Sequence, residues 1–226
     1  MEYIVRPNVN SVYDETGRVK AMLHQLGFVN DTNTLIYIDG TSITNQALSM
    51  DAQSISFGSG VTMSDGYLNI PASSDGRITT TAVAGGYGGS LSAWTMDFYF
   101  EASASTLYIN GNTDYANAWV ITGSGNQELV QRSTSTSFGV TYIPATLIGL
   151  SLQYDNGTLH IWNKGVYVKQ VTMSFTNASG LSFGIGCDGW NGNYSNYISR
   201  LKLFRFSNVA RYTPGSDFEI PDEYKQ

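Results

Sequence analysis

The feature that most constrains this chain is a block of short apolar strands joined by tight turns, at residues 147–206. Asn156-Gly157 lies between two of these strands, and an Asn-Gly pair flanked by strands is among the strongest hairpin signals in a sequence. The predicted strands of the block cover residues 147–154, 158–162, 166–173, 181–186 and 197–206. We therefore predict a β-meander, in which successive strands are antiparallel neighbours in one sheet.

The strand predicted at residues 94–101 shows the alternation typical of a sheet with one buried face. Its apolar set is expected in the core and comprises Trp94, Met96, Phe98 and Phe100. Its second set is expected to form an outward polar face and comprises Thr95, Asp97, Tyr99 and Glu101. Further strands are predicted at residues 35–40, 54–57, 66–71 and 77–82, with shorter ones near 106–110, 118–122, 128–132 and 138–143. The glycine-rich residues 84–90 are predicted to be a flexible loop.

Composition limits the class of protein. A length of 226 residues suits one all-β domain. Only 13% of the residues are charged and the net charge is −6, so the surface repels phosphate groups, and we expect neither a nucleic-acid nor a membrane partner. No apolar run approaches the length that spans a bilayer. The single cysteine, Cys187, excludes an internal disulfide.

Residues 1–34 differ from the rest of the chain. Val19, Met22, Leu23 and Leu26 recur at helical spacing, which predicts a short helix that ends near Gly27. A helix of about ten residues is marginal in water by itself. We therefore predict an N-terminal anchoring or oligomerisation segment over residues 1–34, followed by one domain over residues 35–226. The start of the chain lacks the pattern of a signal peptide.

Residues 34–221 resemble the laminin-G-like, concanavalin A-like jelly-roll domains of bacteriophage structural and tail proteins. The resemblance depends on residues 35–40, 94–100, 153–166 and 198–213, together with Phe218 and Pro221. It implies an all-β antiparallel sandwich of two facing sheets that recognises carbohydrate or serves as a displayed building block. It also implies a protein made in the host cytoplasm and exposed on a virion, with other virion proteins as partners. We expect residues 1–34 to mediate trimerisation or docking to such a partner.

The best binding-site candidate is the loop at residues 188–196, which joins the last two predicted strands and so lies at the rim of the sandwich. Its candidate ligand-binding residues combine aromatic rings with amides and a carboxylate, a mixture that suits sugars, and they are Asp188, Trp190, Asn191, Asn193 and Tyr194. The alternative is that Trp190 closes the end of the core and that the polar residues only make turns. Asp188, Asn191 and Asn193 also offer oxygen ligands for calcium.

The sequence shows no catalytic constellation. Relatives with this fold that hydrolyse polysaccharides place their acids two residues apart on one strand, whereas Asp97 and Glu101 lie about 13 Å apart with Tyr99 between them. We interpret this pair as part of an outward polar strand face opposite a core face, and we expect no enzyme. His24, His160 and Cys187 form no cluster with zinc spacing. Two alternatives to a carbohydrate-binding virion protein stay open: a decoration protein without a ligand, and a polysaccharide-degrading enzyme.

Overall fold

The computed structural model describes most of the predicted sandwich. The described residues are 28–49, 52–71, 73, 76–80, 92–102, 109–111, 122–123, 126–131, 134–141, 146–172, 183–185 and 198–225. The helix predicted before Gly27 and the glycine-rich loop at residues 84–90 lie outside them. No helix of the described part is long and apolar enough to cross a membrane.

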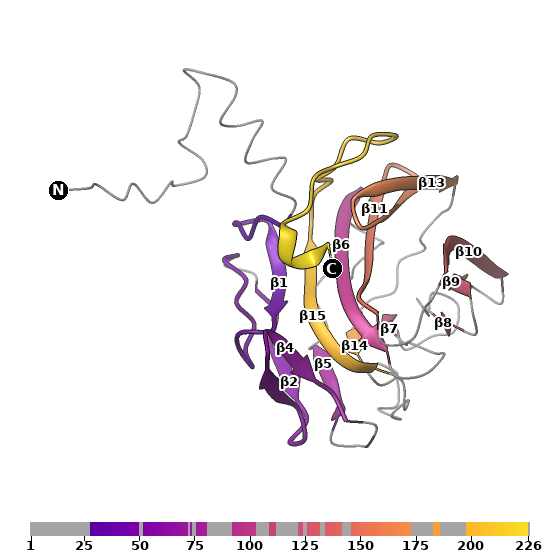
Figure 1. Ribbon diagram of the computed structural model, residues 1–226. Coiled ribbons are helices and arrows are strands. Elements are labelled where there is room, and N and C mark those ends of the chain that lie inside the picture. Colours follow the sequence, from indigo (N-terminus) through magenta and orange to yellow (C-terminus); the bar gives the residue numbers. More distant parts are fainter. Residues whose placement is uncertain are drawn as a thin grey trace.

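The described strands form three sheets in which every pairing is antiparallel (Figure 1). The large sheet has the order β13 (Val166–Thr172), β12 (Thr158–Asn163), β11 (Ile148–Asp155), β6 (Ala93–Ala102), β15 (Ile198–Ser207), β4 (Tyr67–Asn69) and β3 (Thr62–Ser64), with β1 (Thr34–Asp39) also paired to β15. The second sheet has the order β2 (Ile55–Phe57), β5 (Ile78–Thr80), β14 (Phe183–Ile185) and β7 (Ile109–Gly111). The third contains β10 (Thr134–Thr141), β9 (Asn126–Gln131) and β8 (Thr122–Gly123), and a 3-10 helix, η3 (Asp222–Tyr224), lies near the C-terminus.

The hydrophobic core lies between the large sheet and the second sheet. The apolar face of β6 is almost completely buried in it, as predicted, and comprises Trp94, Met96, Phe98 and Phe100. Ile78 of β5 and Ile185 of β14 complete the same cluster from the second sheet. These contacts confirm the predicted all-β antiparallel sandwich.

The turns of the large sheet follow from their sequences. Asn156 and Gly157 both have positive φ, at 44° and 92°, and Lys164 and Gly165 repeat the pattern at 46° and 80°. Two successive positive φ angles define the two-residue turn whose twist matches a hairpin, so the predicted β11–β12 and β12–β13 hairpins are confirmed.

The prediction of a five-strand meander is wrong for its last two strands. After β13 the chain crosses to the second sheet, where β14 pairs with β5 and β7. It then returns to the middle of the large sheet, where β15 lies between β6 on one side and β1 and β4 on the other. Residues 203–207 of β15 are all buried, so both faces of the strand are covered. The sequence of such a strand does not show which neighbours it pairs with.

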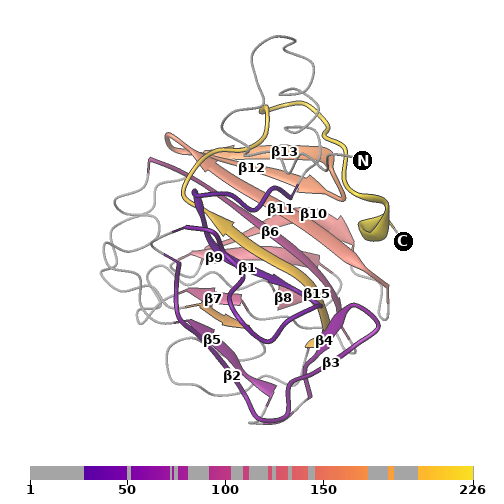
Figure 2. The ribbon, with the colours of Figure 1, turned by 90° about the vertical axis from the view of Figure 1, so that its left-hand side faces the viewer.

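The prediction of an outward polar face on β6 is also wrong. Thr95, Asp97 and Tyr99 have no exposed surface. This face of the large sheet, which we call the outer face, is covered by residues 28–34 and by the C-terminal segment, residues 209–225. Figure 2 shows the C-terminal segment leaving β15 and running past β12 and β13 before it reaches η3.

A second apolar cluster fixes both segments to the outer face. The ring of Phe28 packs edge-on against Tyr99 and Tyr224, at centroid distances of 4.9 and 5.0 Å. Leu203 of β15 and Ile220 of the C-terminal segment are buried in the same cluster. Phe28 and the residues that follow it, up to Thr34, are therefore packed against the outer face of the sandwich.

Candidate functional site

The predicted binding residues lie outside the described part of the chain. Asp188, Trp190, Asn191, Asn193 and Tyr194 all belong to residues 186–197. The ends of this stretch are fixed, because it joins Ile185 of β14 in the second sheet to Ile198 of β15 in the large sheet. The assignment of these five residues to a sugar site remains a prediction.

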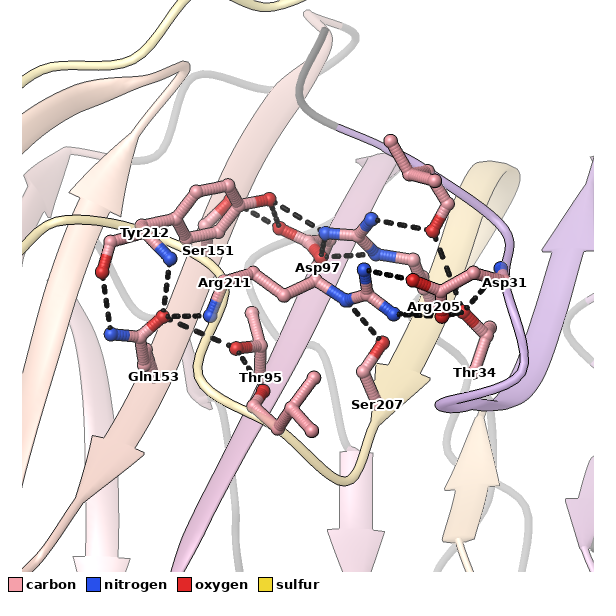
Figure 3. A network of polar contacts seen from close by, with 12 residues as sticks. Asp31, Thr34, Thr95, Asp97, Ser151, Gln153, Arg205, Ser207, Arg211 and Tyr212 are labelled. Carbon is pink, nitrogen blue, oxygen red and sulfur yellow. Dashed lines mark hydrogen bonds and ion pairs between the residues drawn. The ribbon is translucent and has the colours of Figure 1, made fainter. Parts of the chain in front are cut away.

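Among the described residues, the main polar site is a network on the outer face, centred on Asp97 (Figure 3). Strand register creates it, because Ser151 of β11 and Arg205 of β15 are the two cross-strand partners of Asp97. The Ser151 hydroxyl donates to Asp97 Oδ1 at 2.7 Å, and Arg205 Nε donates to Asp97 Oδ2, also at 2.7 Å. The Tyr212 hydroxyl donates to Asp97 Oδ1 at 2.6 Å from the C-terminal segment.

Arg205 is the cation of this network and is completely buried. Its guanidinium donates to the backbone oxygen of Val29 at 3.0 Å and to the Tyr212 hydroxyl at 2.7 Å. Burial by itself lowers the pKa of Arg205, but the adjacent Asp97 carboxylate, together with Tyr212 and Tyr37, raises that pKa above its usual value. For Tyr212, by contrast, burial itself raises the pKa, so this hydroxyl stays protonated and can donate a hydrogen bond.

Gln153 fixes the backbone of the C-terminal segment. Its Oε1 accepts from the backbone N–H groups of Arg211 and Tyr212, each at 2.7 Å. Its Nε2 donates to the backbone oxygen of Tyr212 at 2.9 Å. Thr95, the cross-strand partner of Gln153, donates to the backbone oxygen of Val209 at 2.8 Å. One buried amide thus replaces a strand as the hydrogen-bonding partner of the segment.

Arg211 connects the two segments that cover the outer face. Its guanidinium donates to both carboxylate oxygens of Asp31, at 2.6 and 3.0 Å, and its Nε donates to Ser207 Oγ at 2.8 Å. Burial by itself raises the pKa of Asp31, but the hydrogen bonds and charge of Arg211 outweigh burial and hold the pKa below its usual value. The bidentate geometry is the strong form of this ion pair.

These contacts define what the network does. Asp97 has no exposed surface and its oxygens are occupied by protein donors, so it cannot meet a substrate in this structure. Glu101, the other acid considered from the sequence, forms an ion pair with Arg200 at 3.2 Å. The described residues contain no cluster of three or more histidine, cysteine or acidic side chains that suits a metal ion. The network is structural and holds both segments against the large sheet.

The C-terminal loop, residues 210–219, lines an open hollow with a volume of about 640 Å³. A turn at Pro214-Gly215 shapes it: Gly215 has φ of 78°, and Ser216 N donates to Thr213 O at 3.2 Å. The rings of Tyr212 and Phe218 stack across the loop at a centroid distance of 3.8 Å and an interplanar angle of 5°.

Sequence reasoning treated the stretch at 209–214 only as the mark of a family and missed its physical role. The sequence did contain a signal, because Pro214-Gly215 between Thr213 and Ser216 predicts a turn directly after Arg211 and Tyr212. Three partners of Arg211 and Tyr212 could not be predicted from the sequence, because Asp31, Asp97 and Gln153 lie 58 or more residues away along the chain.

The amino-acid sequence matches no protein-family model and no curated protein. Solved structures do share the fold. The binding domain of Paraclostridial Mosquitocidal Protein 1 aligns with a TM-score of 0.59 at 15% identity, over 79% of this chain and 49% of that one. The receptor-binding domain of botulinum neurotoxin type G gives 0.56 at 14% identity, over 78% and 48%.

Domain 4 of an extracellular arabinanase from Geobacillus stearothermophilus, in complex with arabinotriose, aligns with a TM-score of 0.55 at 14% identity, over 79% of this chain and 95% of that one. The fold is a jelly-roll-like β-sandwich. The two toxin structures are named as binding domains, and the arabinanase domain was solved with a bound trisaccharide. This chain spans about half the length of the two toxin domains, and identities this low show the fold alone.

Proposed function

We propose that this chain is a non-catalytic carbohydrate-binding domain. The observation that carries the proposal is the agreement between its sandwich fold and the arabinanase domain solved with arabinotriose, which aligns over nearly its whole length. The covered outer face favours a binding site in the loops rather than on the large sheet. The central strands of that face are covered by residues 28–34 and 209–225, so a ligand binds at the loops and edges of the sandwich.

We assign the sugar site to the stretch between β14 and β15. Trp190 and Tyr194 supply aromatic faces for the apolar side of a sugar ring, while Asp188, Asn191 and Asn193 supply hydrogen-bonding groups for hydroxyls. An oxygen-rich loop of this kind also suits calcium, which is part of the same proposal.

The proposed setting is the surface of a phage particle, on the resemblance of residues 198–213 to phage virion proteins. One shallow site binds weakly, and display in many copies compensates through avidity. We propose that the stretch before Phe28 trimerises the protein or docks it to another virion protein. Since Phe28 and Asp31 pack on the sheet, the deletion that tests this ends at residue 27. An unchanged mass in solution after that deletion contradicts the trimer.

A glycan array with the full chain tests the sugar site, with Trp190→Ala as the variant. If Trp190 binds sugar, the array signal disappears while the urea midpoint stays unchanged. If Trp190 instead closes the core, the variant loses stability. An array without any signal for the unmodified chain contradicts the carbohydrate proposal and favours a decoration protein without a ligand.

A further inference from the structure

We propose that the hollow of the C-terminal loop, residues 210–219, is a second binding site, which takes a neutral sugar or a similar polyol. Its volume of about 640 Å³ lies within the range of small-molecule sites. The loop is separate from residues 186–197 in the sequence. The inference therefore shares only the class of ligand with the proposed function.

The side chains around the hollow determine the kind of ligand. Thr213 and Ser216 are exposed, and each hydroxyl can both donate and accept a hydrogen bond. Asp217 and Glu219 are exposed carboxylates that accept hydrogen bonds from ligand hydroxyls. The half-buried ring of Phe218 adds apolar surface beside these polar groups. Hydroxyls, carboxylates and an aromatic ring in one small hollow match the alternating polar and apolar surface of a sugar.

Charge excludes the acidic sugars. Arg211 is the only cation that lines the hollow within the described residues, and Asp31 already occupies its guanidinium through two hydrogen bonds. Glu219 is paired with Lys225 at 3.8 Å, but no side-chain cation is paired with the exposed Asp217 carboxylate among the described ion pairs, and Asp217 repels a second negative charge. A ligand that donates hydrogen bonds without a charge of its own fits best.

The loop is rigid without a ligand, because contacts from the large sheet fix its backbone. The Trp162 indole N–H donates to the Ser216 oxygen at 2.8 Å, and Tyr167 N donates to Asp217 Oδ1 at 2.8 Å. Phe218 N donates to the Gly165 oxygen, also at 2.8 Å. Together with Gln153 on the other arm, these bonds hold the hollow open. A site formed in advance loses little entropy on binding.

Gly165 is itself part of this support. It has a φ of 80°, and a Cβ at this position would lie 2.3 Å from the Phe218 oxygen. The β12–β13 turn therefore approaches the backbone of Phe218 as closely as glycine allows, and this contact fixes one arm of the loop.

The test is an NMR titration of the full ¹⁵N-labelled chain with arabinotriose, maltotriose and glucuronic acid. We expect the two neutral sugars to shift the amide signals of Gly215, Asp217 and Phe218 in a saturable way, with a Kd on the order of 1 mM. Glucuronic acid is expected to bind about tenfold more weakly.

Two variants locate the site. Ser216→Trp fills the hollow from an exposed position and is expected to abolish the shifts, whereas Thr62→Trp, at an exposed position on β3, is the matched control and retains them. Asp217→Asn keeps an oxygen for Tyr167 N and removes the charge, so glucuronic acid should gain affinity relative to maltotriose.

The proposal is overturned if no neutral sugar gives saturable shifts in the loop, or if the shifts persist in the Ser216→Trp variant. Tighter binding of glucuronic acid than of the neutral sugars refutes the charge argument. The Trp190→Ala variant separates this proposal from the first one. If the loop amides of this variant still shift on titration with a neutral sugar, the second site is supported, even when the variant has lost its signal on the glycan array.

Discussion

Replacing Asp97 by asparagine tests whether the outer face is held by a buried ion pair. In the structure Asp97 and Arg205 have no exposed surface, and Arg205 Nε donates to Asp97 Oδ2 at 2.7 Å. Asparagine keeps the shape and one oxygen for Ser151 and Tyr212, but it leaves the Arg205 charge buried without a counter-ion. Removing one partner of such a pair costs about 3–5 kcal/mol in the free energy of unfolding.

Urea denaturation measures this loss. With a slope of about 2 kcal/mol per molar urea, a loss of about 4 kcal/mol lowers the midpoint by about 2 M. Glu101→Gln is the matched control, since Glu101 lies on the same strand and pairs with Arg200, but the two side chains are 17% and 31% exposed. A partly exposed pair is worth about 0–1 kcal/mol.

Equal midpoints for Asp97→Asn and Glu101→Gln would refute the reasoning. A second variant separates charge from packing. Combining Asp97→Asn with Arg205→Met removes the buried guanidinium charge that has no counter-ion, so the double variant should be more stable than Asp97→Asn alone. If it is less stable, the loss arises from packing rather than from an uncompensated cation.

Three further predictions concern the same sheet. Gly149→Ala should destabilise the chain by about 1–3 kcal/mol in thermal unfolding, because the new Cβ would lie 2.3 Å from Tyr99 Cε1; an unchanged midpoint contradicts this. Burial lowers the pKa of His160 in the folded chain below 6.5. As the pH drops below 6.5, His160 is therefore protonated in the unfolded chain before it is protonated in the folded chain, and the free energy of unfolding falls until the pH reaches the folded pKa. His160→Gln should remove that loss in urea midpoints compared at about pH 7 and about pH 5. The pKa of Asp31 lies below 3.8, so its contribution is present above that pH and is lost as the pH falls through the folded value. Asp31→Asn should accelerate hydrogen exchange of the Arg211 amide near neutral pH, and equal rates would contradict a stabilising role for the ion pair.

Local sequence predicted the strands and turns well where backbone geometry alone decides them. The Asn156-Gly157 pair indicated a hairpin, and both residues have the positive φ that such a turn requires. Strand β3 was missed, although Asp65-Gly66 forms the same kind of turn between β3 and β4, with φ of 54° and 74°. The signal was the same, but the three residues Thr62–Ser64 are too short and exposed to show alternation.

The candidate sites depend on tertiary contacts more than the strands and turns do. Composition alone suggested a sugar site at residues 188–194, a prediction that lies outside the described residues. The hollow of the C-terminal loop was not predicted from the sequence. It depends on hydrogen bonds from Gln153, Trp162 and Tyr167, which lie about fifty residues or more before the loop along the chain.

The sequence by itself determined most of the longer strands and which β6 residues point into the core between the two sheets, since a period of two follows directly from the extended backbone. The tertiary structure alone decided that the opposite face is also buried. Alternation distinguishes two faces of a strand but does not reveal what covers them. Asp97 became an interior residue because Arg205, 108 residues away, and Tyr212, 115 residues away, meet it there. Such contacts follow from the order of strands in the sheet, and that order is a property of the whole chain.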